Sequence, residues 1–163
     1  MAIAAAADRF YRVWWKGARF SLTFNAFPIE RGGGRRALGY AEELLDKGWS
    51  LIIYPEGHRS RNGEVQPFHH GVSILALEHR VPVVPMYVYG TPEILPPGMP
   101  KAVGPAPVTV AIGEPVLLEP GLSVPEGTAV LEAATRAIAQ PFVPKELRGP
   151  VPAVDVREPV HAG

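Results

Sequence analysis

The sequence contains no cysteine among its 163 residues. This absence excludes disulfide bonds, zinc sites built from thiolates and catalysis by a cysteine nucleophile. The sequence also lacks any run of about 20 apolar residues, the length that a membrane-spanning helix requires. The apolar segment Met1–Ala7 has no basic flank and is too short for a secretory signal peptide. We therefore expect any membrane contact to be peripheral.

The formal net charge is zero, but the charge is unevenly distributed. Residues 1–61 hold ten Lys and Arg against six Asp and Glu, a balance of +4, and residues 62–163 hold six against ten, a balance of −4. A basic front half indicates contact with an anionic substrate or membrane surface. A chance unevenness of surface charge explains the same numbers, so charge alone leaves both interpretations open.

The length suits one domain with its own hydrophobic core. Helical periodicity alternates with short apolar runs, which predicts an α/β fold with a mixed, largely parallel sheet flanked by helices. We expect the domain to span residues 1–139 and the proline-rich residues 140–163 to form a tail or linker. The apolar run Ala2–Ala7 begins so abruptly that we expect the fold to be incomplete at the N-terminus.

The patterns place the helices and strands of this domain. Continuous apolar runs of strand length are typical of strands buried on both faces, and Gly48 is expected to follow the end of a helix. The expected helices are Asp8–Phe24, Arg35–Lys47, His70–His79 and Pro125–Ala139, and the expected extended segments are Asn25–Glu30, Trp49–Tyr54, Val81–Tyr89 and Pro107–Ile112.

The first of these helices, Asp8–Phe24, mixes aromatic and basic side chains. Such a mixture suits a helix that lies on a bilayer surface. A helix with its aromatic side chains in the core and its arginines in water has the same composition, and the aromatics surround the helix rather than forming one stripe. Both interpretations stay open at this point.

Two segments carry side chains suited to binding an anion. Phe27–Arg31 ends in an arginine before a triple glycine, where a guanidinium and the N–H groups of a helix start can hold a phosphate. Tyr54–Ser60 follows an apolar strand and places a carboxylate, a guanidinium and a hydroxyl on one turn, where Gly57 allows close approach of the backbone. In the plainer alternative, Glu56 and Arg59 simply pair with each other.

A third segment, Val81–Met86, is an apolar run with two prolines. Proline in a strand belongs at an edge or a bulge, because it lacks the N–H that a ladder needs. Such an edge could line an apolar groove, or the run could be an ordinary core strand.

In this order and spacing, the three segments resemble motifs two, three and four of the glycerolipid acyltransferases. These are the PlsC-type enzymes that act on glycerol 3-phosphate and 1-acylglycerol-3-phosphate. The resemblance covers residues 2–118, and its most specific part is Tyr54–Ser60, which is similar to Phe/Tyr-Pro-Glu-Gly-Thr-Arg-Ser. It implies a glycerol-3-phosphate acyltransferase-like fold and transfer of a fatty acyl group to a hydroxyl of a lysophospholipid.

The resemblance also implies roles for individual residues. The acceptor site and its phosphate would be held by one group of residues, assisted by a serine, and a proline would lie near the groove for the acyl donor. The residues that would hold the acceptor are Arg31, Glu56, Gly57 and Arg59. The assisting serine is Ser60, and the proline near the donor groove is Pro85.

One part of the family pattern is absent from the chain. The family's first motif is a His followed five positions later by Asp, in which the His acts as general base. None of the five histidines has Asp at that distance. We therefore assign no catalytic residue, expect the missing motif to lie upstream, and expect the chain as given to be inactive.

Other interpretations remain. His58 could replace the missing base, since its ordinary pKa suits that role, although an imidazole in this turn would more naturally donate to the phosphate. A pseudoenzyme that binds anionic lipid or phosphate would use the same residues. A phosphate-ester hydrolase is less well supported, because Glu56 stands nearly alone as a carboxylate at a strand end.

We expect no cofactor and no metal site, and the resemblance implies acyl-CoA or acyl-carrier protein as co-substrate. The adjacent His69 and His70 would point in different directions on a helix, without a further ligand at i+4. No nucleic-acid partner is expected. The absence of cysteine fits a reducing cytoplasm, and we expect a cytoplasmic protein, associated peripherally with the inner face of the membrane through residues 8–24.

Overall fold

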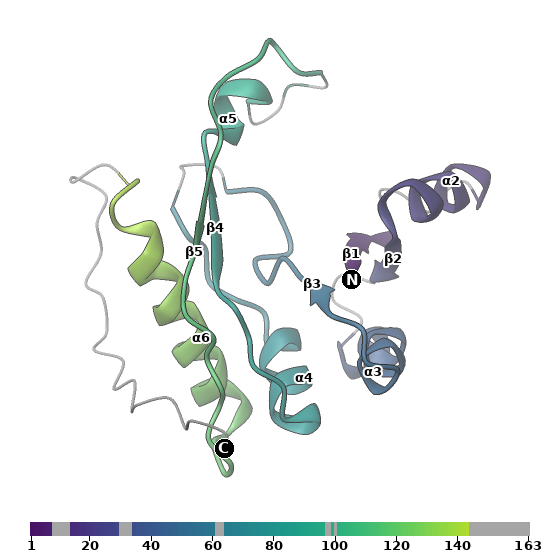
Figure 1. Cartoon of the computed structure of the whole chain (residues 1–163), viewed down its shortest axis with the longest axis vertical. Helices are drawn as coiled ribbons and strands as arrows, with labels where there is room; N and C mark the ends of the chain where they lie inside the picture. Colours follow the sequence, from purple (N-terminus) through teal and green to yellow (C-terminus); the bar gives the residue numbers. More distant parts are fainter. Residues whose placement is uncertain (8–13, 30–33, 61–63, 97–98, 100, 144–163) are drawn as a thin grey trace.

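A computed structural model describes residues 1–7, 14–29, 34–60, 64–96, 99 and 101–143 (Figure 1). Helices surround a parallel sheet, so the predicted α/β class is confirmed. Residues 144–163, most of the predicted tail, lie outside the described residues, as do residues 8–13 of the first predicted helix.

The parallel sheet has three strands in the order β2 (Ala26–Ile29), β1 (Ala2–Ala6) and β3 (Leu51–Ile52). Ile3 pairs with Ala26 on one side and with Ile52 on the other. Because parallel strands need crossover connections, helix α2 (Trp14–Phe24) lies between β1 and β2 in the sequence. A 3-10 turn, η1 (Gly34–Leu38), and helix α3 (Gly39–Asp46) link β2 to β3.

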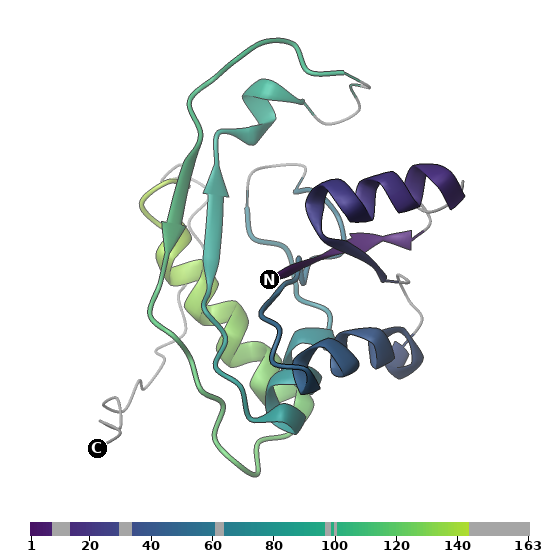
Figure 2. The same ribbon diagram turned by 45° about the vertical axis from the view of Figure 1, so that its right-hand side comes forward.

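A separate antiparallel pair joins β4 (Met86–Tyr89) to β5 (Thr109–Ile112), with Met86 opposite Ile112 and Tyr89 opposite Thr109. The short helix α5 (Thr91–Ile94) lies in the connection between these two strands. Helix α6 (Val124–Ala139) runs alongside the pair (Figure 2). Its N-terminus carries a capping box of Ser123 and Glu126, which satisfies backbone N–H groups that the helix leaves unpaired.

Helix α4 (Gly71–His79) connects the two halves of the fold. Leu75 packs with Phe27 and Ala41 beside the parallel sheet, and the neighbouring Ala76 packs with Leu131 of α6. Ser73 is fully buried, and its hydroxyl lies 2.6 Å from that of Thr128. Polar groups buried in this way are costly unless they are hydrogen-bonded, so the Ser–Thr contact fixes α4 against α6.

Three elements differ most from the sequence prediction. The expected helix Arg35–Lys47 begins as the 3-10 turn, a common form at helix N-termini; Gly48 follows its end with a φ of +76°, as predicted. Within the expected strand Trp49–Tyr54, only Leu51–Ile52 forms a strand, because β1 pairs with those two positions alone. Both residues are half-buried rather than buried.

The prediction of a buried strand over Val81–Tyr89 is also wrong. Pro82 and Pro85 cannot donate to a ladder, so only Met86–Tyr89 forms a strand, and Val83 makes an isolated bridge to Val116. Several apolar side chains of this stretch are exposed, among them Val84, Met86 and Val88.

None of the helices within the described parts of the chain combines the length and the apolar character needed to cross a membrane.

Replacing Gly90 by Ala should destabilise the fold. Gly90 has a φ of +94°, and a Cβ there would overlap the carbonyl oxygen of Pro107. The left-handed backbone alone costs an L-residue about 1–2 kcal/mol, so we expect a loss of at least that size in the free energy of unfolding, measured with urea. Gly104→Ala is the control, since its Cβ would meet nothing within 4 Å; equal losses in the two variants would contradict the prediction.

Candidate functional site

The centre of the candidate site is a tight turn that follows β3. The N–H of Gly57 donates to the carbonyl of Tyr54 at 3.1 Å, which closes a four-residue turn with Pro55 in its second position. Proline is favoured at this position because its ring already sets the φ that the turn needs. Gly57 has a φ of +69°, a conformation that glycine adopts at no steric cost.

The turn is held from one side by His69. The His69 N–H donates to the carbonyl of Pro55 at 2.9 Å. The imidazole lies against Gly57, so that a Cβ on this glycine would come within 3.0 Å of the His69 ring. Gly57 is therefore required both by its backbone conformation and by the packing of the histidine.

The Glu56 side chain points back into the protein. Its Oε2 accepts a 2.9 Å hydrogen bond from the backbone N–H of Gln66. Burial raises the pKa of the Glu56 carboxyl above its ordinary value, although the Gln66 N–H and the nearby His58 and Arg136 side chains oppose the rise. The carboxylate of Glu132 adds to it. Glu56 is thus a half-buried acid with fixed surroundings, suited to orienting a neighbour or a substrate hydroxyl.

The side chains that follow Gly57 in the turn differ in exposure. His58 and Arg59 are exposed and Ser60 is half-buried. The Arg59 Nη1 lies 3.4 Å from the carbonyl oxygen of Leu95, which is long for a hydrogen bond. The pairing of Glu56 with Arg59, the plainer interpretation of the motif, is not the arrangement seen: each side chain has a different partner.

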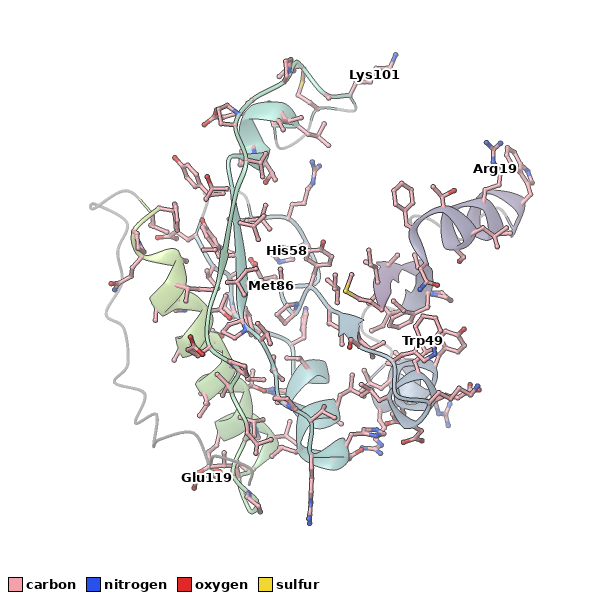
Figure 3. All side chains as sticks on the ribbon, viewed as in Figure 1. Arg19, Trp49, His58, Met86, Lys101 and Glu119 are labelled. Atoms are coloured by element: carbon pink, nitrogen blue, oxygen red, sulfur yellow. The ribbon has the colours of Figure 1, made fainter. Side chains whose placement is uncertain are left out.

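His58 stands between the β4–β5 pair and β3 (Figure 3). Its Nδ1 lies 3.3 Å from the carbonyl oxygen of Arg59. A carbonyl can only accept, so this contact is a hydrogen bond in the tautomer that carries the proton on Nδ1. Its role as a replacement base stays a prediction.

Pro85 is buried immediately before β4. Its carbonyl accepts from the Gly113 N–H at 2.9 Å, and its ring lies close to Gly113 beside Ile138 of α6. The side chain thus seats β4 against α6. Its neighbours Val84 and Met86 are 45% and 46% exposed, so the apolar surface near Pro85 belongs to them.

Arg31 lies outside the described residues. In the sequence it follows the end of β2 by two positions, and the Glu56 turn follows the end of β3. Parallel strands end at the same edge of their sheet, and ligands of α/β proteins commonly bind outside the carboxyl ends of the strands. Four positions after Arg31 in the sequence, Arg35 pairs with Glu78 and, at 3.4 Å, with Glu42.

Sequence reasoning missed the residues that support the turn from behind. Gln66 acts through its backbone N–H, which no side-chain pattern reveals. Glu132 and Arg136 of α6 form an ion pair at 2.8 Å, and their i,i+4 spacing on a helix was the signal available. Within the described residues, no three His, Asp or Glu side chains are grouped to hold a metal ion.

Comparisons with known proteins show the family to which the chain is related. Residues 1–89 match the family model described as Acyltransferase. The chain is 39% identical over 74 residues to a chloroplastic 1-acyl-sn-glycerol-3-phosphate acyltransferase, BAT2, of Brassica napus, covering 45% of this chain and 22% of the relative. It is 41% identical over 110 residues to a 1-acyl-sn-glycerol-3-phosphate acyltransferase of Limnanthes douglasii, covering 64% of this chain and 38% of the relative.

A solved structure is also similar. The crystal structure of the 1-acyl-sn-glycerophosphate acyltransferase PlsC from Thermotoga maritima superposes with a TM-score of 0.68 at 27% identity, covering 85% of this chain and 56% of that one. The chain thus spans little more than half of that structure, and 22% and 38% of the two plant relatives.

The raised pKa of Glu56 predicts a pH dependence of stability. The folded pKa lies above the unfolded one, so the stability contributed by protonation is fully present below the ordinary 4.5 and is lost as pH rises through the folded value. Glu56→Gln removes this dependence. Urea unfolding across this pH window should therefore show the variant gaining stability relative to wild type as pH rises.

The control variant, Glu126→Gln, should show the opposite dependence of stability on pH. Hydrogen bonds from Ser123 lower the pKa of Glu126, so its contribution is lost as pH falls. Glu126→Gln should therefore lose stability relative to wild type as pH rises. The same trend in both variants would refute the assignment for Glu56.

Proposed function

This chain belongs to the acyltransferase family, and on that premise we propose that its turn binds the phosphate of a lysophosphatidate acceptor. The enzyme to which the turn belongs transfers a fatty acyl group from acyl-CoA or acyl-carrier protein to the free hydroxyl of that acceptor. The observation that carries the proposal is the division of the turn into an inward carboxylate, Glu56, and an outward guanidinium, Arg59.

The outward side of the turn suits a phosphate. A guanidinium presents five N–H donors in a planar fork that matches phosphate oxygens. The long contact of Arg59 with the Leu95 carbonyl is easily exchanged for a charged acceptor, because hydrogen bonds to ions are the stronger ones. Ser60 adds a hydroxyl on the same turn, and Arg31 adds a second guanidinium close to β2 in the sequence.

The chemistry needs a proton acceptor as well. The acceptor hydroxyl attacks the thioester carbonyl and passes its proton to a base. An ester bond forms, the C–S bond breaks, and the base returns the proton to the leaving sulfur, which is released as a thiol. The chain holds no His-x4-Asp pair. We propose that Arg31 and the residues of the turn bind the acceptor. Turnover then depends on a base that these binding residues do not supply.

Arg59→Ala should weaken acceptor binding. Loss of a charge-assisted hydrogen bond costs about 1.5–3 kcal/mol, which corresponds to a fall in affinity of roughly tenfold or more. The measurement is calorimetric titration of the 163-residue chain with a short-chain lysophosphatidate, kept below its micelle concentration.

The control for this titration is Lys47→Ala, which removes an exposed cation that pairs with Glu43 on α3. Its affinity should equal that of wild type. An Arg59→Ala variant that binds as tightly as wild type would contradict the proposed role of Arg59.

The proposal extends to a peripheral contact with the membrane through α2. Trp15, Arg19 and Leu22 recur at helical spacing, and Trp15 and Leu22 are 46% and 87% exposed. Arg19 stands at the outer side of this helix (Figure 3). Exposed apolar side chains beside a cation suit the surface of an anionic bilayer, such as the inner face of a cytoplasmic membrane.

Leu22→Ser should reduce binding to vesicles that contain phosphatidylglycerol. Burial of one leucine is worth about 1.5–3 kcal/mol, so the partition coefficient in a sedimentation assay should fall roughly tenfold. Leu117→Ser removes a leucine that is 63% exposed and lies between β5 and α6 in the sequence. Equal losses in the two variants would show that α2 is not the contact.

A further inference from the structure

The Glu56 carboxylate is held by a segment that has no regular structure of its own. Residues 65–69 lie in neither a helix nor a strand, yet the Gln66 N–H of this segment holds Glu56. Backbone outside a ladder takes its position from side chains and from neighbouring elements. The orientation of Glu56 therefore depends on whatever fixes residues 65–69.

Helix α6 supplies this support through Glu132. The Glu132 Oε2 accepts a 3.0 Å hydrogen bond from the backbone N–H of Phe68. Its other oxygen, Oε1, accepts from Arg136 Nε at 3.0 Å and Nη2 at 2.8 Å. A guanidinium that grips a carboxylate with two N–H groups restricts its geometry. One oxygen of Glu132 is thus clamped to the helix, and the other reaches the loop.

The same segment contacts the turn at two points. Gln66 reaches the Glu56 side chain, and His69 reaches the Pro55 carbonyl. Val65 is 5% exposed and packs with Ala139 and Val143, at the end of α6 and beyond it. The segment therefore lies between α6 and the turn and connects them.

We propose that Glu132 is a positioning residue of the acceptor site, acting through Phe68 and Gln66 on the carboxylate of Glu56. This inference rests on the proposed function, because it concerns the same site. In this role Glu132 acts on the site only through the backbone of this segment. It holds residues 66–69 in the one arrangement in which the Gln66 N–H meets Glu56 and the His69 N–H meets Pro55.

The test begins with two substitutions at position 132 in the full 163-residue chain. Amide hydrogen exchange of Gln66 and Phe68 is followed by NMR, and affinity for a short-chain lysophosphatidate by calorimetry. Glu132→Ala removes both acceptors, so exchange at Gln66 should speed up at least tenfold and affinity should fall about tenfold. Glu132→Gln keeps an oxygen for the Phe68 N–H. On a logarithmic scale, its Gln66 exchange rate and its affinity should therefore lie at least halfway from the values of Glu132→Ala to those of wild type.

Two further variants keep the test decisive. If Glu132→Ala does not fold, Glu132→Asp keeps the charge beside Arg136 but withdraws the carboxylate from Phe68, and it should also speed up exchange at Gln66. Glu126→Ala removes the capping box at the other end of α6, at a cost of about 1 kcal/mol. It should leave Gln66 exchange and affinity unchanged.

The outcomes separate this inference from the function on which it rests. Unchanged Gln66 exchange in Glu132→Ala or Glu132→Asp, or an equal change in Glu126→Ala, would overturn the role of Glu132. A wild-type chain that binds no lysophosphatidate would overturn the proposed function alone, since Gln66 exchange still reports the positioning.

Discussion

The hydrogen bond from the Gln66 N–H to the Glu56 carboxylate determines the orientation of the whole turn. A half-buried carboxylate is costly unless a donor compensates for the water that it loses. The donor here is backbone, so it cannot swing away as a side chain could. With Glu56 held inward, the chain that continues through Gly57 presents His58 and Arg59 at the surface.

The rest of the fold serves this arrangement. Helix α4 packs against the parallel sheet through Leu75 and against α6 through Ala76, and so joins the element that precedes the turn to the helix that supports it. The buried contact between Ser73 and Thr128 adds a directional interaction to this packing. Apolar contacts alone allow helices to slide, whereas hydrogen bonds specify one register.

Sequence patterns predicted well the elements that carry strong local signals. The helices His70–His79 and Pro125–Ala139 each begin within one residue of the prediction and end as predicted. The strands were predicted less well, because an apolar run does not reveal its pairing partners. Pro82 and Pro85 shortened β4, and the two-residue pairing with β1 shortened β3. The motif indicated the residues of the turn, but not that Glu56 points away from Arg59.

The amino-acid sequence by itself determined the α/β class, the turn Tyr54–Ser60 and the family resemblance, because helix periodicity, glycine and proline act over a few residues. Only the tertiary structure decided what holds Glu56. Gln66 contributes a backbone N–H that every residue except proline possesses. Glu132 lies 76 positions further along the chain than Glu56 and reaches it only through packing of α6 against the loop. Contacts of this kind depend on distance in space, which no local pattern contains.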